Sequence, residues 1–156
     1  MKELNEYREK LIARLGEAAD EFCGECRAFT DPFKVVEGKW TLHQIASHVR
    51  VVDREVYSTR IRRTLAEENP EFEVFDPDAW MAEQYRREEP LDGILEAFSA
   101  NVKDLCAGLH HLPREAWSRE SRHAHQGGGL TLQLWVERNL AHVEEHLRAV
   151  KRAKNG

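Results

Sequence analysis

The stretch TLQLWVERNLAHVEEHLRAV, residues 131–150, has apolar side chains at steps of three and four residues. This spacing places them on one face of an α-helix, so the stretch predicts an amphipathic helix that begins near Thr131. The apolar face consists of Leu132, Trp135, Val136, Leu140, Val143, Leu147 and Val150. His142 and His146 lie four residues apart on the same helix. The fold therefore depends on what this helix packs against, and so does the role of its histidines.

Three further segments have the same helical periodicity. The first covers the amino-terminal residues and is expected to end at Gly24. The second begins at Thr41, which has the spacing of a capping box with Gln44. The third follows Pro90 and ends before Pro113. The apolar stripe of the second segment is Leu42, Ile45, Val49, Val52, Val56 and Leu65.

The segments between these helices are rich in turn formers. EENPEFEVFDPDAW, residues 67–80, contains two prolines and no helical period, so it is expected to be a long loop before a short helix at about 78–87. REAWSRESRHAHQGGG, residues 114–129, is expected to be a flexible connection. No pair of strands is evident. The sequence predicts an all-α fold: one four-helix-bundle domain over residues 1–156, with a long loop between the second and third long helices.

Composition limits the possible functions. The 156 residues are 41% hydrophobic and 33% charged, as expected for one domain with an apolar core. The chain has no apolar run long enough to span a membrane, and its charged start, MKELNEYREKL, is unlike a signal peptide, so a cytoplasmic protein without a membrane partner is expected. The net charge of -5 disfavours a nucleic-acid partner.

The three cysteines do not indicate a disulfide framework, because their number is odd. Cys23 and Cys26 have the CxxC spacing, but they lie at the end of a helical pattern and no second Cys or His pair accompanies them at a spacing typical of structural zinc sites. We therefore expect no redox or zinc function for this pair.

The histidines are the residues with the clearest chemical potential. His142 and His146 lie about 40° apart around their helix, so both rings can point at one spot. His48 lies on the apolar stripe of the second helix, where an unpaired imidazole would be costly. His43 falls on another side of that helix and is expected to be exposed. Three inward histidines on two helices suit a divalent metal, although core histidines satisfied by hydrogen bonds would give the same pattern.

Two other metal-dependent chemistries fit less well. HVEEH, residues 142–146, has the HxxEH order of one metalloprotease class, with Glu145 as the base. Those enzymes need a cleft for an extended peptide, which a short bundle hardly provides. A di-iron bundle needs paired Glu-x-x-His motifs, and here the residues three before the histidines are Ile45, Asn139 and Val143.

The segments WTLHQIASH, residues 40–48, and TLQLWVERNLAHVEEHL, residues 131–147, together resemble the DinB superfamily. EENPEFEVFDPDAW between them narrows the resemblance to the YfiT-like branch, whose members have long been labelled metal-dependent hydrolases. The similarity extends from about Phe33 to Val150. Each motif is short, and their order and separation make the resemblance specific.

This resemblance implies a four-helix bundle that holds one divalent ion, zinc or nickel, on His48, His142 and His146. Members of the superfamily include transferases and isomerases that use a low-molecular-weight thiol, and YfiT-like proteins are often dimers. A metal-dependent thiol transferase or hydrolase, and a homodimer, are therefore expected. A His-Pro pair often precedes the last helix in the family; here Ala124 follows His123, which leaves the roles of His123 and His125 open.

An open three-histidine site activates a thiol or a water molecule, and nothing in the sequence distinguishes the two. Glu145 is the candidate base or acceptor beside the histidines, and Glu55 is a weaker one. Arg50 and Arg54 are candidates for binding an anionic substrate. The alternative is a non-catalytic metal-binding or stress-response protein, whose closed site would recruit His123 or His125.

Overall fold

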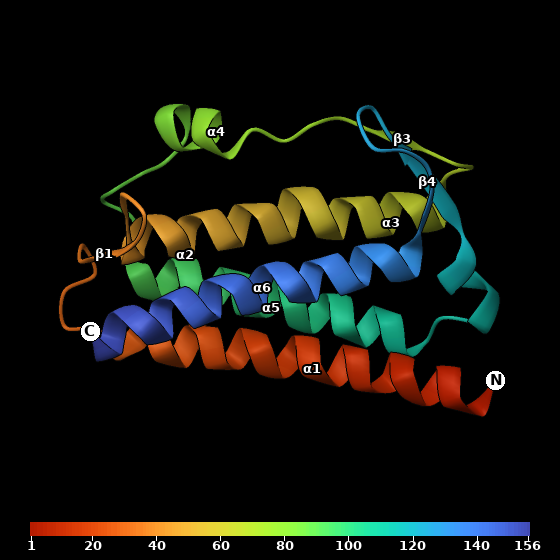
Figure 1. The fold of residues 1–156 in the computed structure, drawn as a ribbon, viewed down its shortest axis with the longest axis horizontal. Helices are drawn as coiled ribbons and strands as arrows, with labels where there is room; N and C mark the ends of the chain where they lie inside the picture. The colour runs from red at the N-terminus through yellow and green to blue at the C-terminus, as the bar shows by residue number, and fades with distance from the viewer.

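The computed structural model describes all 156 residues, and helices account for most of the chain (Figure 1). The helical elements are α1 (Lys2–Arg27), α2 (Leu42–Val51), the π-helix η1 (Val52–Ser58), α3 (Thr59–Ala66), α4 (Pro77–Glu83), α5 (Leu91–His110), the 3₁₀-helix η2 (Arg114–Ser118) and α6 (Leu132–Asn155). Because α2, η1 and α3 follow one another without a break, they form one long helix. None of the helices is long and apolar enough to cross a membrane.

Four long helices form the predicted bundle. α1 packs against α5 and α6, and the α2–η1–α3 helix also packs against α5 and α6. The first two long helices of the chain therefore lie diagonally across the bundle, and Figure 1 shows α6 running alongside the α2–η1–α3 helix. This arrangement places the histidine pair of α6 opposite the helix that carries His48.

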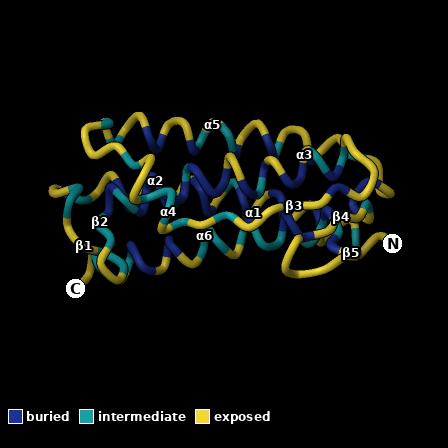
Figure 2. The backbone as a smooth tube through the Cα atoms, turned by 90° about the horizontal axis from the view of Figure 1, so that it is seen from above, coloured by how far each residue is buried: buried dark blue, intermediate teal, exposed yellow.

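The core lies between the four long helices. Buried residues follow the inner faces of the helices, and exposed residues follow the loops and outer faces (Figure 2). Phe22 of α1 meets Phe98 of α5 edge to face, with ring centroids 5.7 Å apart, and Trp135 of α6 is fully buried. The apolar stripes read from the sequence thus supply the interior of the bundle.

The expectation that the chain has no strand pair is wrong. β1 (Val35–Glu37) and β2 (Trp40–Thr41) form an antiparallel pair. β4 (Glu120–His123) pairs in parallel with β3 (Glu71–Phe72) and antiparallel with β5 (Gly127–Thr131). These strands are too short to show an alternating pattern, and the pairing of β3 with β4 joins segments far apart in the chain.

The segment expected to be a flexible connection is therefore ordered: it consists of η2 and the hairpin of β4 and β5. Ser121 Oγ donates to the Leu130 carbonyl at 2.8 Å, and Trp135 Nε1 donates to Ser121 Oγ at 2.7 Å. Gly127 and Gly129 have φ angles of 85° and 72°, a left-handed conformation that glycine adopts without strain. The hairpin is thus fixed to α6 at its base.

Local signals predicted helix starts better than helix ends. The capping box of Thr41 and Gln44 is present, and the Thr131 side chain caps α6. Gly24 does not end α1, which continues to Arg27 because Cys23 and Cys26 are buried in the core, and this packing outweighs the roughly 1 kcal/mol cost of a helical glycine. The helix expected at 78–87 is the shorter α4.

Candidate metal centre

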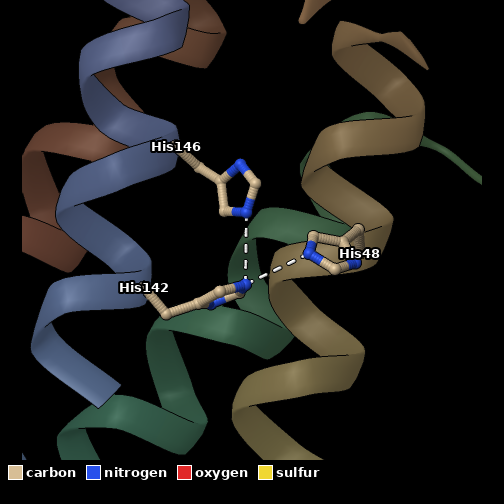
Figure 3. Close-up of side chains that lie close together, drawn as sticks. All are labelled: His48, His142 and His146. Carbon is tan, nitrogen blue, oxygen red and sulfur yellow. Dashed lines mark hydrogen bonds between the residues drawn. The ribbon is translucent and has the colours of Figure 1, made fainter. Parts of the chain in front are cut away.

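Three histidines from two neighbouring helices converge in the interior of the bundle (Figure 3). His48 comes from α2, and His142 and His146 come from successive turns of α6. The Nε2 atom of His142 lies 3.1 Å from that of His48 and 3.2 Å from that of His146. One ligand atom from each ring falls within 4.8 Å of the others. The structure therefore brings together the three histidines that the sequence singled out.

Two of the three separations between the ligand nitrogens suit a divalent metal ion. Zn–N bonds of 2.0–2.1 Å at tetrahedral angles separate ligand nitrogens by about 3.3 Å. The two Nε2–Nε2 distances of 3.1 and 3.2 Å are close to that value. The Nδ1 atoms of His48 and His142, on the far side of each ring from the cluster, are buried and make no hydrogen bond. The donor set thus fits an ion that accepts imidazole ligands.

Burial keeps two of the imidazoles in the form that binds metal. Desolvation, with a smaller contribution from His146, lowers the pKa of His48 to about 4. Desolvation also lowers the pKa of His142 well below its ordinary value, and the two neighbouring histidines add to the effect. Both rings are neutral at pH 7, and a metal ion does not have to displace a proton from them.

A carboxylate that the sequence did not reveal orients the third histidine. His146 Nδ1 donates to Glu37 Oε1 at 2.8 Å, which leaves Nε2 of His146 as the lone-pair atom facing the cluster. Glu37 ends β1, and Gly38 follows it with a φ of 56°, so the chain turns at this point. The only local signal is a glutamate before a turn glycine, and 109 residues separate the two partners.

The two glutamates proposed from the sequence are not hydrogen-bonded to the histidines. Glu145 is exposed on α6, and the acceptor beside His146 is Glu37 instead. Glu55 is exposed and pairs with Arg54 at 3.3 Å, because η1 rotates it away from the face of His48. Glu37 therefore replaces both as the acceptor beside the site, while a role for Glu145 as a base stays a prediction.

The expectation that His43 is exposed is wrong. His43 is 2% exposed, and its two ring nitrogens lie 2.6 Å from the Tyr85 hydroxyl and 2.6 Å from the Glu89 carbonyl. α4 and the chain that follows it cover this side of α2, which periodicity alone does not reveal. Arg50 binds both carboxylate oxygens of Glu89, so this arginine is already paired.

A pocket of about 390 Å³ opens on two of the three histidines. His48 and His142 lie in its wall, which also contains apolar side chains such as Val52, Val56 and Phe75. His123 and Arg60 line the same pocket but do not join the cluster of ligand atoms. A closed site with His123 or His125 as a fourth ligand therefore finds no support, and a small molecule can approach the cluster.

Comparisons with known proteins agree with this architecture. The sequence profile of the DinB superfamily matches residues 3–150. YfiT from Bacillus subtilis, described as a probable metal-dependent hydrolase with an unusual four-helix bundle topology, superposes with a TM-score of 0.87 and 21% sequence identity, covering 96% of this chain and 87% of that chain. At this identity the likeness shows a shared fold. No curated protein matches this chain in sequence.

Proposed function

This chain belongs to the DinB superfamily, and we propose that it is a metal-dependent enzyme whose divalent ion is held by His48, His142 and His146. The observation that carries the proposal is the convergence of the three histidines beside a pocket that opens on two of them. An ion that only tied two helices together would need no such pocket. The relative described as a probable metal-dependent hydrolase supports the same conclusion.

A divalent ion held by three histidines lowers the pKa of a coordinated water or thiol and so supplies a nucleophile at neutral pH. The chain's own residues prepare this chemistry. Glu37 holds the ring of His146, and the Trp40 ring lies 5.1 Å from that of His48. Val52, Val56 and Phe75 make part of the pocket wall apolar, which strengthens electrostatic interactions inside it.

More specifically, we propose that the protein is a thiol-dependent S-transferase or a hydrolase and that its metal ion is zinc or nickel. The thiol is favoured by resemblance to superfamily members that use low-molecular-weight thiols, and Glu145 is the candidate base. A homodimer is proposed on the same ground, and sedimentation equilibrium of the purified protein tests it.

Metal analysis of the purified chain tests the site. The wild type is expected to retain about one divalent ion per chain, and His142→Ala to lose it, because two imidazoles rarely hold such an ion. His111→Ala is the matched control, since His111 is exposed and lies outside the cluster. The proposal fails if the wild type takes up no ion after reconstitution with zinc or nickel, or if His142→Ala binds it as tightly as the control.

A cobalt-substituted sample then separates a catalytic site from a closed one. A site open to substrate is expected to change its visible spectrum when a small thiol is added. A spectrum that does not respond to thiols, together with no turnover of electrophilic or hydrolysable substrates, would instead indicate a non-catalytic metal-binding protein.

A further inference from the structure

The π-helix η1 turns Arg60 toward the face that carries His48. Arg60 lies 12 residues after His48, which in an uninterrupted α-helix would place them about 120° apart around the axis. A π turn contains about one residue more than an α turn, so the residues after it are rotated back by about 100° around the helix axis. Arg60 then falls within about 20° of His48. Accordingly Arg60 is buried, whereas its neighbour Thr59 is exposed.

Arg60 is a buried cation without a carboxylate partner. It is 8% exposed, and its one hydrogen bond runs from Nη2 to the Glu73 carbonyl at 3.1 Å. Its guanidinium carbon lies 4.8 Å from the centre of the Trp135 ring. Nε and Nη1 make no hydrogen bond, yet neither is among the fully buried unpaired atoms. Because Arg60 lines the pocket, these free donors are accessible from it.

His123 adds a second donor to the same pocket. The backbone N–H of His125 donates to His123 Nδ1 at 3.1 Å, so Nδ1 is the acceptor and the neutral ring carries its proton on Nε2. Burial, followed by the charge of Arg60, lowers the pKa of His123, which keeps this ring neutral at pH 7. His123 therefore offers an N–H from Nε2, and β4 holds the ring in place.

The polar groups of the pocket away from the three-histidine cluster are mainly donors. Tyr57 lines the pocket with a hydroxyl that has no protein partner, and no aspartate or glutamate is among the lining residues. The side-chain oxygen of Gln126 already accepts a hydrogen bond from Arg138. Arg60 brings a full positive charge to these neutral donors, and the charge of Arg138 also acts on Tyr57, Arg60 and His123. This environment suits an anionic group with two oxygens, such as a carboxylate.

We infer that Arg60, His123 and Tyr57 form a subsite for a carboxylate on the molecule that approaches the three-histidine cluster. The inference rests on the proposed function and specifies its substrate class. It also replaces the sequence-based candidates for anion binding: Arg50 is paired with Glu89, and Arg54 is exposed and paired with Glu55. The carboxylate belongs either to the thiol or to the second substrate.

A matched pair of thiols tests the inference on the cobalt-substituted protein. Mercaptohexanoate has a carboxylate at the end of the chain opposite its thiol, and mercaptohexanol has an alcohol there. Shorter and longer pairs vary the distance between the thiol and that group. The best-fitting carboxylate is expected to bind about tenfold or more tightly than its alcohol, as charge-assisted hydrogen bonds imply. Arg60→Gln should remove this preference without changing the affinity for mercaptohexanol, whereas Arg54→Gln, the matched control, should keep it.

A second measurement needs neither metal nor thiol. Hexanoate, but not hexanol, is expected to shift the ring resonances of His123, assigned by comparison with His123→Gln. A shift with hexanoate but no preference among the thiols would assign the carboxylate to the second substrate. The inference is overturned if neither measurement distinguishes carboxylate from alcohol, or if Arg60→Gln weakens both ligands equally. If the wild-type protein does not bind cobalt, only the proposed function is refuted, because the hexanoate measurement does not depend on a bound metal ion.

Discussion

Replacing Glu37 is the most direct test of how the structure prepares the metal centre. The carboxylate accepts a 2.8 Å hydrogen bond from Nδ1 of His146 and from no other member of the cluster. Glu37→Ala removes this acceptor while leaving all three proposed ligands in place. Glu37→Gln keeps an oxygen acceptor and removes the negative charge. The two variants therefore separate the orientation of the ring from its electrostatic stabilisation.

The expected effect follows from the exposure of the pair. Losing an outer-shell acceptor of a ligating histidine typically lowers metal affinity about 10- to 100-fold. The Glu37 side chain is 31% exposed and that of His146 only 7%, so water can partly replace the carboxylate. We expect Glu37→Ala to weaken zinc binding about tenfold, or ~1.4 kcal/mol, with Glu37→Gln intermediate.

Competition with a chromophoric zinc chelator measures these affinities. Glu55→Gln is the matched control, because this glutamate is exposed and pairs with Arg54 instead of a histidine. Equal affinities for wild type and Glu37→Ala would refute the reasoning that the hydrogen bond positions His146. A loss in Glu55→Gln as large as that in Glu37→Ala would show that general surface charge, rather than this contact, sets the affinity.

Three further predictions concern stability. Removing the ion with a chelator should lower the melting temperature by about 10 °C, and adding zinc back should restore it. The reason is that a free zinc concentration of about a thousand times Kd adds ~4 kcal/mol to the free energy of unfolding. If scanning calorimetry shows no change in melting temperature, the metal site is contradicted. Burial raises the pKa of Asp53 from 3.8 to about 6, so its contribution to stability is present below pH 3.8 and lost as the pH rises through 6. Asp53→Asn, which can still accept from Asn101, should therefore stabilise the fold by ~1–3 kcal/mol near pH 8 and give no gain near pH 4, as measured by urea unfolding. Gly129→Ala should lower the free energy of unfolding by ~1–2 kcal/mol, because the φ of 72° is strained for alanine. Gly128→Ala should lower it little, because its new Cβ meets only Arg122 Cγ at 3.5 Å. Equal melting temperatures for the two variants would count against strain in the hairpin.

Sequence periodicity predicted the elements that carry the site. Four amphipathic segments are sufficient to predict four packed helices, because each apolar stripe has to be buried against another. The capping box at Thr41 placed the start of α2 correctly. Spacing on α6 identified His142 and His146, and an inward position on α2 identified His48. These are local properties, which a single helix shows before it packs.

Features that depend on contacts across the chain were not predictable in this way. Glu37 reaches His146 because β1 and β2 turn the chain back against α6. His43 is buried because the segment after α4 covers it. The pairing of β3 with β4 makes an ordered support out of a segment that looked like a flexible connection.

The amino-acid sequence by itself determined which apolar residues of the four long helices face inward, since helical period and capping act within a few residues. Tertiary structure decided what those residues meet. The π-helix turns Arg60 toward the pocket, and the diagonal placement of α1 and α2 sets α6 beside His48. The physical reason is that a helix specifies its apolar face locally, whereas its neighbours, its rotation and the loops that cover it are chosen by the packing of the whole chain.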